Sequence, residues 1–134
     1  MSLIEELKIN NYALIASNGY HSTDSGIKPV ISKINENIDY FNGLDVADKI
    51  IGKASAMLFA LSKPKSIECI VLSETGQQIL EKYKIPYKYE VLTKQIINRK
   101  GDDICPMENA VKDIDDLNDA LVALNNTIST LSAK

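Results

Sequence analysis

The sequence predicts a single α/β domain, residues 1–134, in which a mixed sheet of about four to five strands lies between two helical layers (α/β/α). A nearly continuous apolar run at 66–72 is typical of a central strand that is covered on both faces. A helix at 76–83 and a strand at 87–97 follow it, and this order predicts a right-handed parallel crossover. Apolar residues at steps of three and four from Val111 to Leu131 predict one long amphipathic helix at the end of the chain.

The chain is expected to open with a helix and a hairpin. Ser2 and the glutamate three residues further on have the spacing of a capping box, which predicts a helix at 2–9. Asn18-Gly19 is a strong signal for a tight turn, so strands at 12–17 and 20–25 should pair antiparallel. The second of these strands alternates in polarity and should lie at an edge of the sheet.

Two further helices are expected in the middle of the chain. Pro29 suits the first turn of a short helix at 30–36. Asp45 can cap a longer helix at 46–61. This longer segment is apolar around most of its circumference, which is typical of a central helix that is buried on more than one side.

The composition excludes several classes of protein. Apolar residues make up 45% and charged residues 25%, so the chain can form an ordinary core without a disulfide or a metal. The formal net charge of -3, the absence of Trp and the presence of only two Phe argue against nucleic-acid binding. The first ten residues lack the apolar core of a signal peptide, and the longest apolar stretch, 54–61, is too short to span a bilayer. We therefore expect a cytoplasmic protein that binds neither nucleic acid nor membrane.

Polar and charged side chains gather at three predicted helix starts. Helices that follow strands begin at the carboxyl edge of the sheet, where ligands bind in α/β proteins. Their free N–H groups favour anions. The first start carries Asp45, Asp48, Lys49 and Lys53, the second Ser73, Glu74 and Thr75, and the third Asn98, Arg99, Gly101, Cys105 and Glu108.

The two lysines at the first start are four residues apart on one face of the predicted helix. Like charges at this spacing repel slightly, so something should offset them. Lys49 and Lys53 either face solvent, with their stems covering apolar surface, or line a cleft that binds an anion.

The other groups at these starts also have two interpretations. Cys105 is a candidate nucleophile, because a thiol at a helix start is shifted toward thiolate, or it is a weak cap. Asp45 and Asp48 form a cap pair or include a catalytic carboxylate, and Glu74 either caps or acts as an acid or base. Arg99, just beyond a predicted strand, suits anion recognition or belongs to a solvated loop.

Five segments are specific in combination and together span nearly the whole chain: Gly26-Ile27-Lys28-Pro29, Val46-Ala47-Asp48-Lys49-Ile50-Ile51-Gly52-Lys53-Ala54, Ser73-Glu74, Asn98-Arg99-Lys100-Gly101 and Cys105-Pro106-Met107-Glu108. With these segments the sequence resembles an uncharacterised prokaryotic family, a domain of unknown function with a cytidine-deaminase-like fold. The resemblance implies that fold and the location of its cleft, and it implies no reaction.

The zinc site of the deaminases is not expected here. Those enzymes hold zinc between a His-x-Glu at one helix start and a Pro-Cys-x-x-Cys at the next. The corresponding starts carry Asp48-Lys49 and Ser73-Glu74 instead. A three-ligand site would have to assemble His21, Cys69 and Cys105, but the first lies on a hairpin and the second within a strand. No metal and no cofactor is expected.

Three hypotheses about function follow. In the first, the cleft binds a small anionic or nucleotide-like ligand in a regulatory role, with charge from Lys49, Lys53 and Arg99 and hydrogen bonds from Ser73 and Asn98. In the second, the protein is a metal-independent enzyme that uses Cys105, or else Glu74 or Asp48. In the third, it is a structural protein that forms a homodimer through the last helix.

Overall fold

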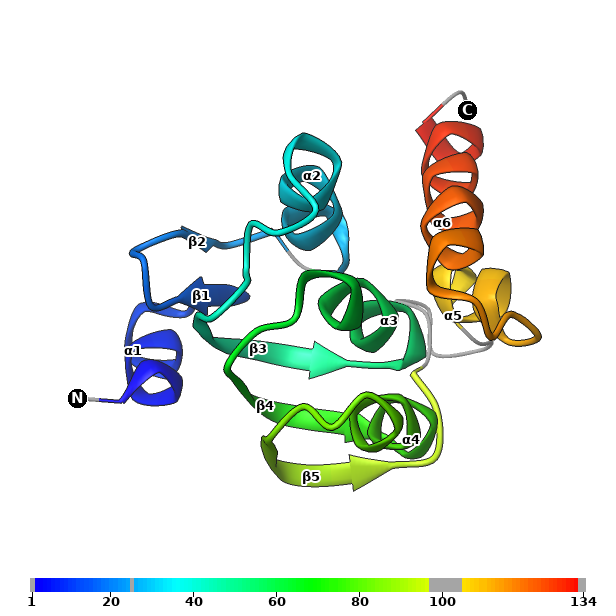
Figure 1. Ribbon diagram of the computed structural model, residues 1–134. Coiled ribbons are helices and arrows are strands. Elements are labelled where there is room, and N and C mark those ends of the chain that lie inside the picture. The colour runs from blue at the N-terminus through cyan, green and yellow to red at the C-terminus, as the bar shows by residue number, and fades with distance from the viewer. Residues whose placement is uncertain (1, 25, 97–104, 133–134) are drawn as a thin grey trace.

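The computed structural model describes residues 2–24, 26–96 and 105–132, and it shows an α/β fold built on one mixed sheet (Figure 1). The strand order is β2-β1-β3-β4-β5. Strand β1 is antiparallel to both β2 and β3, whereas β3, β4 and β5 are parallel. The predicted class, the mixed sheet and the parallel crossover are confirmed. The strands span Leu14–Ala16 (β1), His21–Ser22 (β2), Asp45–Ile51 (β3), Ser66–Ser73 (β4) and Tyr87–Thr93 (β5).

Helix α3 is the centre of the main core. Eight of its ten residues are buried, and the cluster around them joins α2, α4 and α6 to the sheet. In Figure 1, α3 and α4 lie side by side over the parallel strands, and α6 stands beyond α3. The helices span Leu3–Asn10 (α1), Lys28–Glu36 (α2), Lys53–Ser62 (α3), Glu74–Lys82 (α4), Pro106–Val111 (α5) and Leu117–Ser132 (α6).

A smaller core lies beneath α1. Leu7 of this helix packs with Ile15 of β1 and Ala47 of β3, apart from the main cluster. None of the described helices combines the length and the apolar character that a membrane crossing requires.

Several local expectations are confirmed. The hydroxyl oxygen of Ser2 accepts from the N–H of Glu5 at 3.3 Å and caps α1. The hairpin turns at Gly19, whose φ of 96° is a conformation that glycine adopts without strain. Strand β2 is an edge strand as expected, although it is only two residues long. Pro29 lies in the first turn of α2.

The predicted helix at 46–61 is wrong in its first half. Val46 to Ile51 belong to β3, the middle strand, and α3 begins only after Gly52. The β-branched residues of this segment suit a strand, and β1 and β4 satisfy its backbone groups on both sides. Asp45 is therefore no helix cap; its carboxylate accepts a hydrogen bond from the hydroxyl of Ser66 on the neighbouring strand, at 2.6 Å.

The single long helix at the end of the chain is also wrong, because α5 and α6 are separate helices. The carboxylate of Asp116 accepts from the backbone N–H of Asp119 at 2.9 Å and so caps the start of α6. Asp side chains that bond nearby backbone groups in this way interrupt a helix even where apolar periodicity continues. Strand β5 likewise ends at Thr93, before the predicted boundary at residue 97.

Asp48 is an acidic residue inside the core. It is 5% exposed, and its register neighbours across β3 are Leu14 and Cys69, both members of the main cluster. Its carboxylate accepts from the N–H of Ile50 at 3.3 Å. Burial raises the pKa of Asp48 to about 8, against the weaker effect of its backbone hydrogen bonds. Asp48 therefore carries a proton at neutral pH.

Because Asp48 is buried in its protonated form, we expect the free energy of unfolding to decrease as the pH rises. Between pH 4 and pH 8 the folded protein holds the Asp48 proton and the unfolded chain does not, so the free energy of unfolding should fall by up to about 1.4 kcal/mol per pH unit in this window. Asp48→Asn removes the titration, so the stability of this variant relative to the wild type should increase from pH 5 to pH 8. Urea unfolding at each pH measures the difference. Asp39→Asn, which changes an exposed aspartate, is the control. Parallel pH profiles for Asp48→Asn and the wild type would contradict the prediction that folded Asp48 keeps its proton.

Candidate functional site

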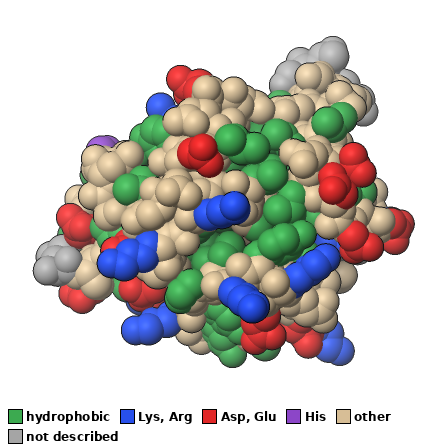
Figure 2. Space-filling model, viewed as in Figure 1, with side chains coloured by type: hydrophobic (Ala, Val, Ile, Leu, Met, Phe, Trp, Pro, Cys, Tyr) green, Lys and Arg blue, Asp and Glu red, His purple; other side chains and the backbone are tan. Residues whose placement is uncertain are grey.

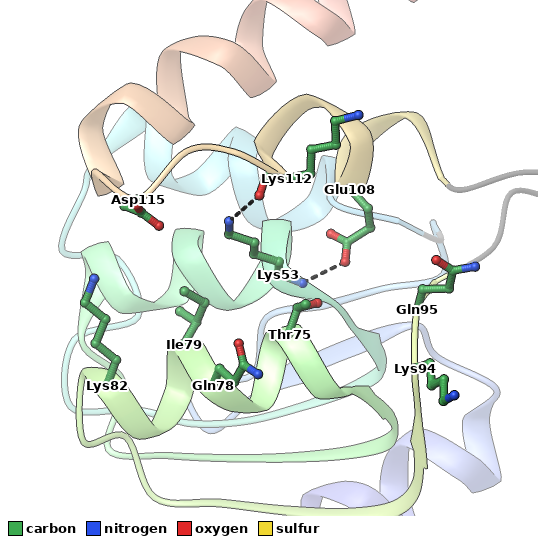
Figure 3. Close-up of a pocket in the computed structure, with 10 residues that line it drawn as sticks. All are labelled: Lys53, Thr75, Gln78, Ile79, Lys82, Lys94, Gln95, Glu108, Lys112 and Asp115. Atoms are coloured by element: carbon green, nitrogen blue, oxygen red, sulfur yellow. Dashed lines mark hydrogen bonds between the residues drawn. The ribbon is translucent and has the colours of Figure 1, made fainter.

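A cavity of about 430 Å³ lies between α3, α4 and α5, and its lining runs along α4 from Thr75 in the first turn to Lys82 at the end. Figure 3 shows its walls, which come from the start of α3, one face of α4, the residues after β5, and the α5–α6 connection. The described lining residues are Lys53, Thr75, Gln78, Ile79, Lys82, Lys94, Gln95, Glu108, Lys112 and Asp115.

Glu108 joins α5 to the start of α3. Its two carboxylate oxygens accept from the backbone N–H groups of Lys53 and Ala54, each at 2.7 Å. These N–H groups have no partner within their own helix, and they carry the positive end of the helix dipole. Glu108 thus occupies the position at the α3 start where an anionic ligand would otherwise bind.

Two glycines bring the helix starts together. A Cβ atom at Gly52 would overlap the Glu108 carboxylate and lie 2.8 Å from Cγ1 of Ile96. A Cβ atom at Gly76 would lie 3.0 Å from the carbonyl carbon of Gly52. Contacts under about 3 Å force something to move, so a side chain at Gly52 would displace its neighbours, whereas one at Gly76 would press on the backbone of Gly52. The first turns of α3 and α4 therefore lie in direct contact.

One N–H group at the α4 start, that of Gly76, is satisfied by the chain itself. The hydroxyl oxygen of Ser73 accepts from the N–H of Gly76 at 2.9 Å, and Ser73 is fully buried. Its hydroxyl also lies 3.1 Å from that of Thr75, which lines the cavity. Ser73 thus acts as a helix cap.

The environment of Glu108 changes its acidity in opposing ways. Burial raises the pKa of Glu108, and the hydrogen bonds from Ala54 and Lys53, together with the Lys53 charge, lower it; the net direction is upward. Both carboxylate oxygens already accept hydrogen bonds from N–H groups, so the arrangement is that of a structural anion at a helix start.

The cavity lining is positively charged. The described lining residues include four lysines and two acidic residues. This is a surplus of two positive charges in a chain whose net charge is -3. The ammonium group of Lys53 donates to the carbonyl of Lys112 at 3.1 Å. In Figure 3, Lys82 extends from α4 toward Asp115, whereas the ammonium groups of Lys94 and Lys112 point away from the middle of the cavity. Of the ion pairs between described residues, none includes these lysines.

The structure separates the two lysines that the sequence places on one helix face. Lys53 begins α3 and lines the cavity. Lys49 lies on β3, where its ammonium group donates to Oδ1 of Asn11 at 2.9 Å, and it is not among the described lining residues. The predicted ligand residues Asn98 and Arg99 lie outside the described residues, as does Gly101.

The candidate catalytic groups do not converge. Cys105 is partly buried before α5, its N–H donates to the carbonyl of Ile96 at 3.0 Å, and it is not among the described lining residues. Asp48 lies within the core, and Glu74 is exposed in the first turn of α4.

The three candidate zinc ligands, His21, Cys69 and Cys105, are not among the described lining residues of the cavity. His21 stacks on Tyr12 with a ring distance of 4.3 Å, and Cys69 is buried within β4. Within 2–24, 26–96 and 105–132, no three His, Cys, Asp or Glu side chains gather as a metal site would require.

Several lining residues were missed from the sequence. Gln78, Ile79 and Lys82 share one face of α4 with Thr75, which the sequence had marked, and their helical spacing is a signal that was present in the sequence. Lys94 and Gln95 directly follow β5, and Lys112 follows α5. Nothing local marks these three, because tertiary packing alone brings them to one cavity.

The fold and the site together define a small α/β domain with a lysine-lined cavity between α3, α4 and α5. The chain belongs to the family described as TM1506, domain of unknown function (DUF1893), whose sequence model matches residues 2–128. The predicted membership of a domain-of-unknown-function family is thus confirmed.

A solved structure supports the same assignment. The chain is similar to a DUF1893 family protein (TM1506) from Thermotoga maritima, with 26% sequence identity and a TM-score of 0.81. The similarity covers 94% of this chain and 85% of the other. No curated protein matches the chain.

The Glu108 carboxylate should contribute measurably to stability. Glu108→Ala removes two charge-assisted hydrogen bonds from the α3 start, so the free energy of unfolding should fall by about 1–3 kcal/mol. Urea denaturation measures the change. Glu74→Ala, which removes an exposed first-turn glutamate of α4, is the matched control and should change stability by less than about 1 kcal/mol. Equal effects of the two substitutions would contradict the assignment.

The substitution Gly52→Ala tests the contact between the Glu108 carboxylate and the α3 start by changing the α3 start. The added methyl group meets the Glu108 carboxylate, so Gly52→Ala should cost less free energy in the Glu108→Ala background than in the wild type. A double-mutant cycle by urea unfolding gives the coupling. Additive effects would mean that the carboxylate does not rest against Gly52.

Proposed function

We propose that this domain binds a small, multiply anionic ligand in the cavity between α3, α4 and α5. The observation that carries the proposal is the positive lining of one cavity in a chain that is negative as a whole. A cleft lined by one sign of charge raises the local concentration of the opposite charge. One end of the cavity, at the starts of α3 and α4, also lies where ligands bind in α/β folds.

The lining favours an aliphatic polar ligand over a nucleotide. The described lining residues include no aromatic side chain on which a base could stack, and Ile79 supplies the apolar contact. Thr75, Gln78 and Gln95 offer hydroxyl and amide groups that suit a polyol or a carboxylate. We therefore narrow the ligand to sugar phosphates and polycarboxylates.

The lysines, rather than the helix starts, would hold the anion. Glu108 already accepts from two N–H groups of the α3 start, and Ser73 accepts from the N–H of Gly76 at the α4 start. Lys53 and Lys82 stand on neighbouring helices that both line the cavity, and Lys94 and Lys112 add positive potential at its margins. Arg99 remains a proposed contributor.

The contact between the α3 and α4 starts supports the proposal that this domain has a cytidine-deaminase-like fold without the zinc site. In the zinc deaminases the metal is held between two helix starts. Here the corresponding starts meet through Gly52 and Gly76, and the Glu108 carboxylate rests on the first of them. On this proposal, protein groups fill the metal position and the neighbouring cavity is left for binding.

A binding or regulatory role fits the described geometry better than catalysis. The groups proposed for a metal-independent enzyme, Cys105, Glu74 and Asp48, lie at a helix start, on the surface and in the core. A nucleophile and its base need to be within hydrogen-bond reach of each other. Between the residues that the structure describes, no hydrogen bond joins any two of these three side chains.

Ligand titration tests the proposal. A sugar bisphosphate and citrate should raise the melting temperature of the wild type, and ADP should raise it no more than inorganic pyrophosphate does. Lys82→Glu should weaken binding at least about fivefold by isothermal titration calorimetry, because it reverses a charge in the cavity. Added salt should weaken binding as well.

The matched control is Lys65→Glu, which makes the same charge change at an exposed lysine before β4. It should leave the affinity near that of the wild type. The proposal fails if none of the probes binds, or if Lys82→Glu and Lys65→Glu change the affinity equally.

A further inference from the structure

Strand β5 is an edge strand of the sheet, and it is exposed along most of its length. Residues 88–92 are all exposed, and the apolar side chains among them are Tyr89 at 40%, Val91 at 52% and Leu92 at 40%. Figure 1 places β5 at the lower edge of the molecule, and Figure 2 shows hydrophobic side chains at the lower edge of the same view. An edge strand of this length with exposed apolar residues is a template for pairing with another strand.

The backbone of β5 is oriented for such pairing. The N–H of Ile67 on β4 donates to the carbonyl of Pro86 at 2.9 Å. Because alternate residues of a strand face the same neighbour, Pro86 and Lys88 direct their backbone groups toward β4. Tyr87 and Tyr89 then direct theirs toward the open edge.

We propose that a second copy of this chain pairs with β5 in antiparallel orientation, about a twofold axis through Tyr89. In this register Tyr89 lies opposite Tyr89 of the second copy, and each Lys88 lies opposite Glu90 of the other copy. Directly opposite residues share one face of the sheet, so both lysine–glutamate pairs form on the same face. A twofold interface requires this self-complementarity of a single patch.

The neighbouring registers are less favourable. An axis through Lys88 places two lysines opposite each other, and an axis through Glu90 places two glutamates opposite each other, which is destabilising. Only the Tyr89 axis, among these three, pairs unlike charges.

The charge pattern favours a second copy over an unrelated partner. A positive and a negative residue flank Tyr89 symmetrically, so the strand is complementary to itself. Glu90 also forms an ion pair with Lys8 of α1, which positions its carboxylate on the α1 side of the sheet. The contact is independent of the cavity, and it differs from dimerisation through α6.

Charge reversal tests the pairing. Wild-type protein should dimerise in a concentration-dependent way by sedimentation velocity, because one strand pair buries less than the roughly 1,200 Å² typical of a stable interface. Lys88→Glu and Glu90→Lys should each be monomeric at concentrations where the wild type is dimeric. The double variant Lys88→Glu/Glu90→Lys should be dimeric again.

Mixing supplies a second test. The two single variants, monomeric alone, should form a heterodimer when combined, since every opposed pair is then attractive. Lys8→Ala controls for loss of the ion pair within the chain and should remain dimeric. Circular dichroism checks that each variant folds.

A cysteine at the proposed axis locates the contact. Tyr89→Cys should form a disulfide-linked dimer under mild oxidation, because opposed residues of a hydrogen-bonded antiparallel pair have Cα atoms about 5.5 Å apart. Val91→Cys is the matched control, since it does not meet itself in this register. A wild type that is monomeric at all concentrations, a dimer that survives both single reversals, or cross-linking that is no greater at residue 89 than at residue 91 would overturn the proposal.

Discussion

The contact between the Glu108 carboxylate and the start of α3 organises the carboxyl edge of this protein. It joins residues 55 positions apart in the chain, because Glu108 accepts from the N–H of Lys53. A buried helix such as α3 leaves N–H groups at its start that need partners. Because Glu108 supplies them from α5, that short helix is held over the sheet edge, and Gly52 must lack a side chain. The position of α5 in turn closes one side of the cavity.

This contact also determines which charges remain for a ligand. The dipole of α3 is already balanced by Glu108, and the α4 start is capped by Ser73. Lysine ammonium groups, on flexible stems, are what the cavity retains. Flexible stems around an open space suit ligands that carry several separated charges better than one compact anion, since each ammonium can adjust to its own partner.

The sequence predicts the elements that local signals mark and fails where long-range partners decide. The cap at Ser2, the turn at Asn18-Gly19 and the strand at 66–72 are local, and all are confirmed. The segment 46–51 is apolar enough for a buried helix or a central strand, and its pairing with β1, about 30 residues earlier, decides between them. The candidate site follows the same division. Lys53, Thr75 and Glu108 were marked by helix starts, whereas Lys94 and Lys112 gather only through tertiary packing.

The two edges of the sheet differ in a way that links its two proposed surfaces. The edge strand β2 is only two residues long and is joined to β1 by a hairpin. It therefore offers few backbone groups for pairing with another strand. The β5 edge is seven residues long, and Lys94 and Gln95 of the cavity follow it directly. The proposed pairing on β5 would therefore adjoin the cavity wall that Lys94 and Gln95 form.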